Sequence, residues 1–372
     1  MRIVIFGLSI TSSWGNGHAT TFRALVRALH ERGHRIVFFE RNAEWYANNR
    51  DLPIPRFCEL RLYGTWEQIQ SEVMNELRAC DVALVGSYFP DGVAAIDCML
   101  ASNVPVKAFY DIDTPITVSH LREIGGTSYV RKEQIPGFDL YFSFTGGPML
   151  REIEQRFGAR RAVPLYCSFD PREYREYSAN KRFACDLSYM GTYAPDRQPK
   201  LEELLCEPAR QLPGSRFIVA GAQYPKELRW PQNVRRIVHL NPRWHGRFYS
   251  SSRLTLNITR REMVLAGHSP SVRLFEAAAC AATLVSDNWP GLDHFFQPGR
   301  EILLPASPGD VVRYIRDLGD EELRAIGRRA QERVLAAHTS AHRAEEFERA
   351  VEAVYQGGAV LTRPQPAASA AD

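Results

Sequence analysis

The clearest structural signal lies in the stretch Ser269-Pro-Ser-Val-Arg-Leu-Phe-Glu-Ala-Ala-Ala-Cys-Ala-Ala-Thr-Leu-Val-Ser-Asp287. Ser269 is a candidate helix N-cap and Pro270 suits the first helical position, so an alanine-rich helix is expected to start here. The apolar run from Thr283 to Ser286 follows without a spacer and has the length of a short buried strand. A helix that leads directly into a buried strand indicates a sheet in which strands and helices alternate.

The first turn of this helix could bind an anion. It would present the free backbone N–H groups of Ser271, Val272 and Arg273 beside the positive end of the helix dipole and a guanidinium group. These groups suit a diphosphate, because charge-assisted hydrogen bonds to phosphate are strong. Glu276, about one turn further on, can accept paired hydrogen bonds from a sugar diol such as a ribose. The alternative is an Arg273–Glu276 ion pair on an ordinary helix.

The composition is that of a soluble globular protein of 372 residues, with 45% hydrophobic and 24% charged residues, long enough for two domains. The net charge of +3 suits small anionic ligands but is too small for a dedicated nucleic-acid binder. The seven cysteines include no C-x-x-C pair, so neither a zinc site nor a disulfide framework is indicated. No stretch approaches the roughly 20 apolar residues of a membrane span, and the N-terminal apolar run is too short for a signal peptide. We therefore expect a cytoplasmic protein.

Apolar runs and helical periodicities alternate along the chain. The expected strands are 2–7, 34–40, 57–63, 81–87, 106–110, 139–144, 162–167, 185–190, 216–220, 234–239, 254–258 and 283–286, with helices between most of them and three more from 308 to about 355. This alternation predicts an α/β protein with two Rossmann-like, doubly wound parallel sheets in tandem. The expected boundaries are 1–170 for the first domain, 171–184 for a linker, 185–338 for the second domain, 339–357 for a helix that braces the first domain, and 358–372 for a disordered tail.

A glycine-rich loop, Leu8-Ser-Ile-Thr-Ser-Ser-Trp-Gly-Asn-Gly-His18, separates the first expected strand from the first helix. Such a loop brings backbone close to a ligand at the carboxyl edge of a parallel sheet, which makes Gly15, Asn16 and Gly17 candidate binding residues. The loop has neither the G-x-G-x-x-G of dinucleotide sites nor the Gly-Lys-Ser/Thr of a P-loop. His18 would face the cleft between the domains, where a neutral imidazole can take a proton from a hydroxyl. It could instead cap its helix or donate a hydrogen bond to phosphate.

The stretch from Ser269 to Asp287, together with Asn288-Trp-Pro-Gly-Leu-Asp-His-Phe-Phe-Gln-Pro-Gly-Arg-Glu-Ile-Leu-Leu304, resembles the group-1 glycosyltransferases, in particular their spore-maturation CgeB-like branch. The resemblance extends from Met1 to about Tyr355. It implies the GT-B fold, in which the C-terminal domain holds a nucleotide sugar and the N-terminal domain holds the acceptor.

In that superfamily two glutamates eight positions apart hold the donor, and backbone amides between them hold its phosphates. Glu276 matches the glutamate that contacts the ribose, and Ser271 and Val272 match the amide positions. Position 268 is His where the other glutamate, which contacts the transferred sugar, is expected.

The resemblance also implies binding roles for residues at other strand ends of the second domain. Gly191 and Thr192 would let backbone approach the diphosphate, Arg197 and Arg260 would add positive charge, and His239 and Leu240 would line the base pocket. Trp289 is a candidate wall near the sugar, and Trp14, Ser128, Tyr129 and residues 142–147 are candidates for an acceptor site, since aromatic faces can stack on sugars.

Inverting GT-B enzymes resemble this chain in carrying a His just past the first strand, which in the plant-type members is oriented by an Asp about a hundred residues later. Asp111 and Asp113 lie 93 and 95 positions after His18. An Asp that accepts a hydrogen bond from one ring nitrogen fixes the tautomer and raises basicity at the other. Because Asp113 precedes Thr-Pro and suits a helix N-cap, we expect Asp111 to be the partner of His18.

Together these inferences predict a glycosyltransferase that moves a sugar from a nucleoside-diphosphate sugar to a hydroxyl-bearing acceptor, with neither a metal nor another cofactor. The His at position 268 favours inversion, with His18 as the base and the Ser271 and Val272 amides with Arg273 stabilising the leaving diphosphate. Two alternatives stay open: a nucleotide-sugar epimerase or hydrolase of the same fold, and a non-catalytic nucleotide-binding protein. The modest charge argues against nucleic acid as a partner, whereas contact with a membrane surface through a lipid-linked acceptor stays open.

Overall fold

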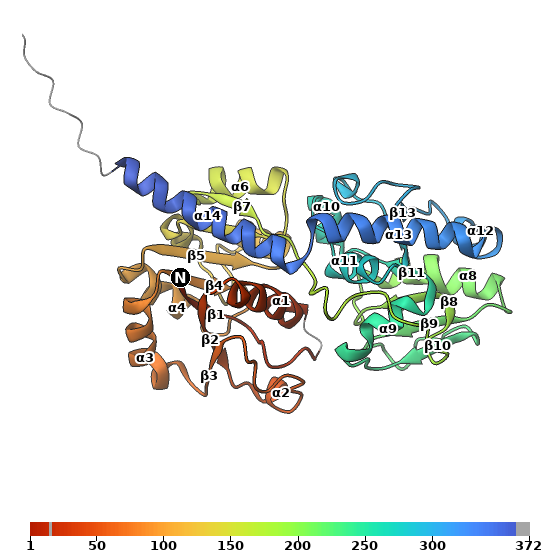
Figure 1. Cartoon of the computed structure of the whole chain (residues 1–372), viewed down its shortest axis with the longest axis horizontal. Coiled ribbons are helices and arrows are strands. Elements are labelled where there is room, and N and C mark those ends of the chain that lie inside the picture. Colours follow the sequence, from red (N-terminus) through yellow and green to blue (C-terminus); the bar gives the residue numbers. More distant parts are fainter. Residues whose placement is uncertain (15–16, 362–372) are drawn as a thin grey trace, which may run out of the picture.

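The computed structural model describes residues 1–14 and 17–361 of the chain. Two parallel sheets lie side by side, each with helices on both faces (Figure 1). The strand order is β3-β2-β1-β4-β5-β6-β7 in the first sheet and β10-β9-β8-β11-β12-β13 in the second. The predicted pair of doubly wound Rossmann-like sheets is confirmed.

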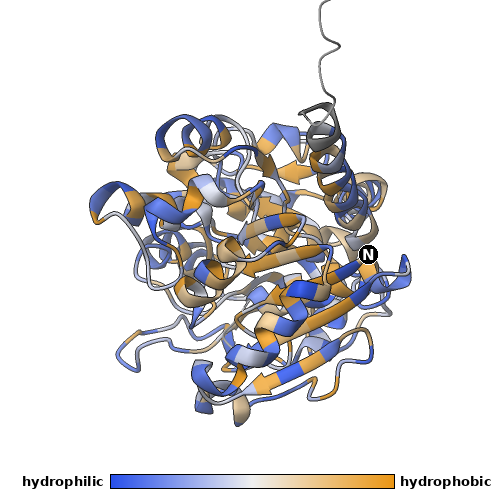
Figure 2. Ribbon diagram, turned by 90° about the vertical axis from the view of Figure 1, so that its left-hand side faces the viewer, coloured by the Kyte–Doolittle hydropathy of each residue, from blue (hydrophilic) through white to orange (hydrophobic). Residues whose placement is uncertain are grey.

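The first sheet contains β1 (Arg2–Phe6), β2 (Arg35–Arg41), β3 (Glu59–Tyr63), β4 (Val82–Gly86), β5 (Val106–Asp111), β6 (Leu140–Ser143) and β7 (Ala162–Pro164). Its connections are α1 (Gly17–Glu31), α2 (Glu44–Ala47), α3 (Trp66–Ala79), α4 (Gly92–Ala101), α5 (Thr114–Glu123), the 3-10 helix η1 (Lys132–Gly137) and α6 (Pro148–Phe157). Side chains of a strand alternate between faces, so Val4 and Phe6 enter one hydrophobic cluster while Ile3 and Ile5 enter another on the opposite face. Figure 2 shows the hydrophobic residues concentrated in the central strands and the hydrophilic ones on the outer helices.

The second sheet contains β8 (Cys185–Met190), β9 (Phe217–Ala220), β10 (Val234–Ile237), β11 (Ser252–Asn257), β12 (Thr283–Ser286) and β13 (Ile302–Leu303). Its connections are α7 (Gln198–Leu201), the π-helix η2 (Glu202–Cys206), α8 (Glu207–Gln211), the 3-10 helix η3 (Pro242–Trp244), α9 (His245–Ser250), α10 (Arg261–Ala266), α11 (Val272–Ala279), the 3-10 helix η4 (Leu292–His294), α12 (Pro308–Asp317) and α13 (Asp320–Ala337). The two-residue strand β13 and the six-residue helices α9 and α10 were not predicted, because segments of that length show no periodicity.

Helix α11 begins later than predicted. Its N-cap is Ser271, not Ser269, and Val272 is its first residue. The hydroxyl of Ser269 instead lies 2.8 Å from that of Thr145 in the first domain, and the Pro270 carbonyl accepts from the Cys167 thiol at 3.2 Å. These contacts hold residues 269 and 270 in the domain interface, so the helix can start only after them.

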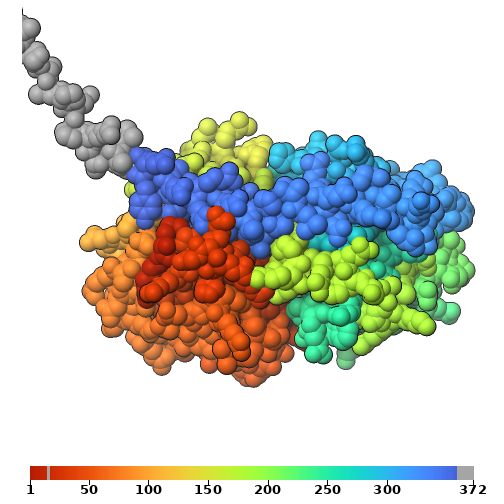
Figure 3. Space-filling view, in the orientation of Figure 1, coloured from red at the N-terminus to blue at the C-terminus, as the bar shows by residue number. Residues whose placement is uncertain are grey.

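The last helix, α14 (Ser340–Leu361), leaves the second domain and packs beside α1 on the first (Figure 1). Phe347 is fully buried there and stacks on Phe142 with ring centroids 5.3 Å apart. In the space-filling view the C-terminal helices extend across both halves of the molecule (Figure 3). The helix reaches Leu361, within the expected tail, and residues 362–372 lie outside the described part of the chain. No helix in residues 1–14 and 17–361 is long and apolar enough to cross a bilayer.

Candidate active site

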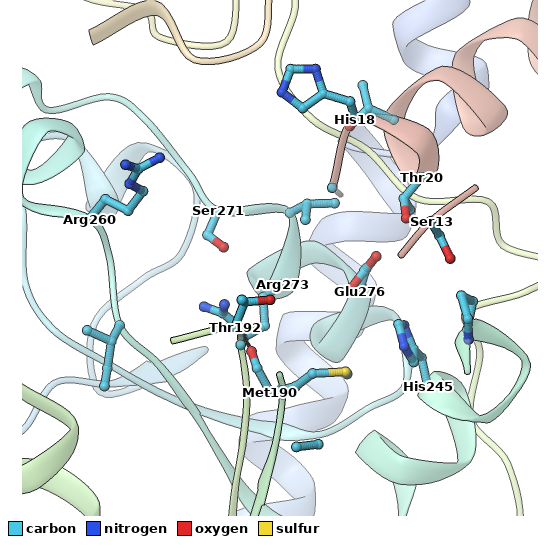
Figure 4. A pocket seen from close by; sticks show the side chains of 18 of the residues that line it. Ser13, His18, Thr20, Met190, Thr192, His245, Arg260, Ser271, Arg273 and Glu276 are labelled. Carbon is cyan, nitrogen blue, oxygen red and sulfur yellow. Dashed lines mark hydrogen bonds between the residues drawn. The ribbon is translucent and has the colours of Figure 1, made fainter. Parts of the chain in front are cut away.

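A cavity of about 430 Å³ lies between the two domains, at the carboxyl ends of their strands. That volume is in the range of small-ligand sites. The predicted donor-side and catalytic residues that line it are Gly17, His18, Gly191, Thr192, Arg197, His239, Leu240, Arg260, Ser271, Val272, Arg273 and Glu276. Of the acceptor-site candidates, Trp14 and Phe144 line the same cavity. Gly15 and Asn16 lie outside the described residues. Figure 4 shows His18 from α1 on one side, and on the other Ser271, the N-cap of α11, with Arg273 and Glu276 from that helix.

The N-terminus of α11 offers hydrogen-bond donors to this cavity. Leu274 donates its backbone N–H to the Ser271 carbonyl at 3.0 Å, whereas the N–H groups of Ser271, Val272 and Arg273 have no partner within the described residues. Ser271 and Val272 line the cavity. Free N–H groups at the positive end of a helix favour a phosphate or another anion.

Three arginines bring positive charge to the same place. Arg273 is buried; it donates to the Met190 carbonyl and, at 2.8 Å, to Oδ1 of Asn257. Arg197 donates to the Thr192 carbonyl at 2.7 Å, and its Nε, like that of Arg260, is buried without a partner in the described part of the chain.

Within the described residues none of these three guanidinium groups forms an ion pair with a carboxylate. Burial lowers the pKa of Arg197, and the nearby charge of Arg273 lowers it further. The alternative of an Arg273–Glu276 ion pair is therefore wrong. The positive charges of the three arginine side chains in the cavity are available to an anionic ligand.

Gly191 has no side chain where these groups crowd together. A Cβ atom there would lie 2.6 Å from the Tyr189 hydroxyl oxygen and 3.0 Å from a terminal nitrogen of Arg273. The glycine after β8 thus leaves room for the Arg273 side chain, which donates to the carbonyl of Met190, the last residue of that strand.

Glu276 is buried at the floor of the cavity. Burial raises its pKa to about 7, although hydrogen bonds from Tyr174 and Tyr249 counteract part of the rise. The Tyr249 hydroxyl lies 3.5 Å from Oε2 of Glu276. Next to it, burial lowers the pKa of His245 to about 4, so this imidazole is neutral near pH 7 and hydrogen-bonds the Leu240 carbonyl at 3.1 Å.

His18 pairs with Asp113, not with Asp111. Its Nε2 lies 3.8 Å from Oδ2 of Asp113, which occupies the N-cap position of α5 without capping it through its side chain. Asp111 is fully buried and accepts hydrogen bonds from Tyr141 at 2.5 Å and Thr117 at 2.8 Å. These contacts hold its carboxylate away from the cavity, and burial raises its pKa to about 7. The predicted His18–Asp111 pair is therefore wrong.

The loop between β1 and α1 is held by two carboxylates, the buried Glu40 and the exposed Asp51. Glu40 at the end of β2 accepts hydrogen bonds from the backbone N–H groups of Ile10 at 2.6 Å and Thr11 at 3.0 Å, and from the hydroxyls of Ser9 and Thr11. Asp51 accepts from the N–H of Ser13 at 2.9 Å. The loop also brings Trp14 against His239 of the second domain, with ring centroids 4.1 Å apart.

Several residues at the site were missed by the sequence reasoning. Tyr88 lies edge-on to His18, with ring centroids 5.3 Å apart, and Asn257 orients Arg273. Asn257 is the last residue of β11 and lies one residue before the end of the predicted strand 254–258, so it could have been noticed, since strand ends face the cleft. Nothing in the sequence singles out Tyr88.

Two residues predicted near the transferred sugar do not line the cavity. The ring of His268 lies between two glycines, so that a Cβ atom on Gly147 or Gly291 would come within 2.4 Å of it. Trp289 is buried against Phe295, with ring centroids 5.9 Å apart, as expected of a packing residue.

Comparisons with known proteins bear on the fold. Residues 197–349 match the model of a family described as glycosyl transferase-like. Sucrose-phosphate synthase from Thermosynechococcus elongatus has a similar structure, with a TM-score of 0.69 and 12% identity over 96% of this chain and 100% of that one. No curated protein matches the chain in sequence.

Two further solved structures are similar. Alr3699/HepE from Anabaena in complex with UDP and glucose has a TM-score of 0.67 and 12% identity over 95% of this chain and 100% of that one. An α-glucosyltransferase in complex with UDP-glucose and DNA has a TM-score of 0.69 and 13% identity over 95% of this chain and 99% of that one. The chain therefore has the two-domain GT-B fold of these structures, and residues 197–349 match a family model described as glycosyl transferase-like.

Proposed function

We propose that the protein is a cytoplasmic glycosyltransferase that moves a sugar from a nucleoside-diphosphate sugar to a hydroxyl-bearing acceptor. The observation that carries the proposal is the convergence of Arg197, Arg260 and Arg273 with the free N–H groups of α11 on one cavity, with no carboxylate beside the guanidinium groups in the described residues. A diphosphate has the charge and the acceptor oxygens to satisfy these groups. The complexes of two similar structures with UDP and UDP-glucose favour a uridine nucleotide as the donor.

The donor would lie along the second domain. Its diphosphate occupies the N-terminus of α11, its ribose hydroxyls donate to Glu276, and its base lies beside His239 and Leu240. The resemblance of the stretch from Ser269 to Leu304 supports the further proposal that the chain belongs to the CgeB-like branch of the group-1 enzymes.

In the transfer step His18 removes the proton from the acceptor hydroxyl. The acceptor oxygen then bonds to the anomeric carbon, and the bond from that carbon to the diphosphate oxygen breaks with its electron pair leaving on the diphosphate. Asp113, 3.8 Å from the imidazole, stabilises the imidazolium that forms, and the arginines stabilise the charge on the leaving group. Attack opposite the leaving group inverts the configuration of the anomeric carbon.

Calorimetric titration with UDP and with uridine tests the donor site. We expect wild-type protein to bind UDP more tightly than uridine, and Arg197→Gln to weaken UDP binding by about 10- to 100-fold, the equivalent of one charge-assisted hydrogen bond. Uridine has no phosphate, so its affinity should not change. Arg229→Gln, at an exposed position outside the cavity, is the matched control.

Equal affinity for UDP and uridine in wild-type protein would reject the diphosphate site. Rapid release of UDP from UDP-glucose without any acceptor would instead favour the hydrolase alternative.

A further inference from the structure

Two segments that are distant in the sequence carry a large excess of positive charge. Residues 174–184 and 234–251 contain seven arginine or lysine residues and one carboxylate, Glu176, which gives them a net charge of +6. The whole chain carries +3, so the remaining residues together carry −3. A concentration of positive charge on a protein that is otherwise acidic indicates a surface that attracts an anionic partner.

The two segments contact each other at the second domain. Arg235 in β10 donates to the backbone carbonyl of Arg182 at 2.5 Å. The rings of Phe183 and Trp244 approach to 6.2 Å between their centroids. In the space-filling view the yellow-green chain around residue 175 lies on the molecular surface, at the boundary between the two halves (Figure 3). The charges of both segments therefore combine in one region of the surface.

Five exposed arginines of these segments form what we call the basic patch. The guanidinium carbons of Arg175 and Arg247 lie 5.2 and 4.9 Å from the ring centre of Tyr177. Those of Arg243 and Arg247 lie 5.7 and 5.6 Å from the ring centre of Trp244. These cation–π contacts hold the side chains in place on the surface. The patch consists of Arg175, Arg182, Arg235, Arg243 and Arg247.

The charges of the basic patch are not neutralised by the protein itself. In the part of the chain that the structure describes, none of its five guanidinium groups forms an ion pair with a carboxylate. The carboxylates that flank the first segment are paired with other arginines: Asp170 and Glu173 with Arg27 at 2.6 and 2.8 Å, and Asp186 with Arg253 at 3.2 Å. The patch is therefore available to an anionic partner.

The chemistry of the patch suits phosphate groups on an extended surface. An arginine guanidinium can bind phosphate through two parallel N–H groups. Guanidinium groups cover the rings of Tyr177 and Trp244, so these rings do not offer the free faces on which the bases of a single strand stack. None of the exposed large hydrophobic side chains among the described residues belongs to the patch, so it lacks the apolar anchor of a protein interface. A bilayer with anionic headgroups presents phosphates over a wide plane and attracts arginines near its surface.

We propose that the basic patch is the docking surface for a membrane that contains anionic phospholipids. The arginines bind the lipid phosphates electrostatically, and no side chain of the patch enters the bilayer core. Pro242 and His245, which lie in the second of the two segments, also line the candidate active site. Docking therefore brings that rim of the cavity close to the membrane surface. The inference goes beyond the proposed glycosyl transfer and does not depend on it, since the membrane is recognised through its charge.

Flotation of the full chain with lipid vesicles tests this surface without donor or acceptor. Vesicles of phosphatidylcholine alone are compared with vesicles of an equimolar mixture of phosphatidylcholine and anionic phosphatidylglycerol. We expect wild-type protein to bind only the mixed vesicles, and to be released at about 1 M salt, where the screening length falls to about 3 Å.

Variants of the patch locate the binding. The double variant Arg243→Gln, Arg247→Gln should lower the partition coefficient about 25-fold, because each basic residue near an anionic surface contributes a factor of roughly five. The double variant Arg175→Gln, Arg182→Gln should act in the same way, and Arg243→Lys with Arg247→Lys should retain binding. The matched control, Arg151→Gln with Arg328→Gln, removes the same charge from exposed positions outside the patch and should leave the partition coefficient within about twofold.

The proposal is overturned if wild-type protein binds neither kind of vesicle or both equally, if both glutamine double variants of the patch retain binding, or if the control loses as much. Binding of a single-stranded RNA oligonucleotide that is tighter than binding of the mixed vesicles at the same salt would assign the patch to nucleic acid and overturn it too. UDP titration of the same samples reports separately on the donor site.

Discussion

Asp111 and Asp113 show why residue identity alone did not settle the catalytic pair. The sequence placed both at the end of a strand, and β5 does end at Asp111, but only Asp113 lies beside His18. Tyr141 from β6 and Thr117 from α5 donate hydrogen bonds to Asp111, so Asp113 is the carboxylate left to face the imidazole. Contacts between neighbouring elements of this kind have no signature in a single sequence.

Replacing the proposed base and its partner should affect turnover rather than binding. We expect His18→Ala to lower kcat by about 10²- to 10⁴-fold, because a positioned general base contributes that much. Asp113→Asn should lower kcat by a smaller factor, and UDP affinity should change in neither variant. Asp111→Asn is the matched control and should leave kcat nearly unchanged. A loss in Asp111→Asn as large as that in Asp113→Asn would restore Asp111 as the partner.

Glu276 should make a pH-dependent contribution to stability. Its folded-state pKa of about 7 lies above the 4.5 of a solvent-exposed glutamate, so its ionisation opposes folding as the pH rises from about 4.5 to 7. Glu276→Gln should therefore match wild type near pH 4.5 and be more stable by about 1–3 kcal/mol at pH 8, since each pH unit is worth about 1.4 kcal/mol. Urea unfolding of the ligand-free proteins at both pH values measures the difference.

The exposed Glu59→Gln provides the comparison and should show no such trend. At pH 8 Glu276→Gln should also bind UDP more weakly, because the amide accepts fewer hydrogen bonds from the ribose. A variant that is destabilised at pH 8 would contradict this account.

At the scale of single elements, the loop between β1 and α1 was recognised from its glycines, but what holds it was not. Glu40 ends an apolar run, and nothing in the sequence indicates that it binds the loop. In the structure its buried carboxylate accepts hydrogen bonds from the backbone N–H groups of Ile10 and Thr11. The start of α11 was likewise predicted two residues too early. Ser269 and Ser271 are equally suitable N-caps in the sequence, and only the contact of Ser269 with Thr145 of the first domain decides between them.

Glu40→Gln should loosen this loop. The amide NH₂ group would face N–H donors, leaving at least one buried donor unpaired at a cost of about 1–3 kcal/mol. Urea unfolding should show that loss, whereas the exposed Glu44→Gln should have almost no effect. An unchanged midpoint in Glu40→Gln would mean that the loop finds other partners.

For the molecule as a whole, periodicity was sufficient to predict two tandem parallel sheets, because each strand and helix carries its own apolar pattern. The same periodicity could not predict how the two domains pack against each other. Contacts such as Trp14 with His239 join residues that are more than two hundred positions apart and belong to different sheets.

The return of α14 to the first domain makes that domain discontinuous in the chain, with the second domain inserted between β7 and α14. Two backbone connections therefore cross between the halves, and they run side by side: Phe169 and Thr339 form a parallel bridge, and Ser340 donates its N–H to the Phe169 carbonyl at 2.9 Å. Two interdomain segments that are hydrogen-bonded to each other restrict the domains to rotation about one axis and oppose a twist of one domain against the other. Opening of the cleft should therefore be a rotation about that axis, and closure should restore the same relative position of His18 and α11 each time.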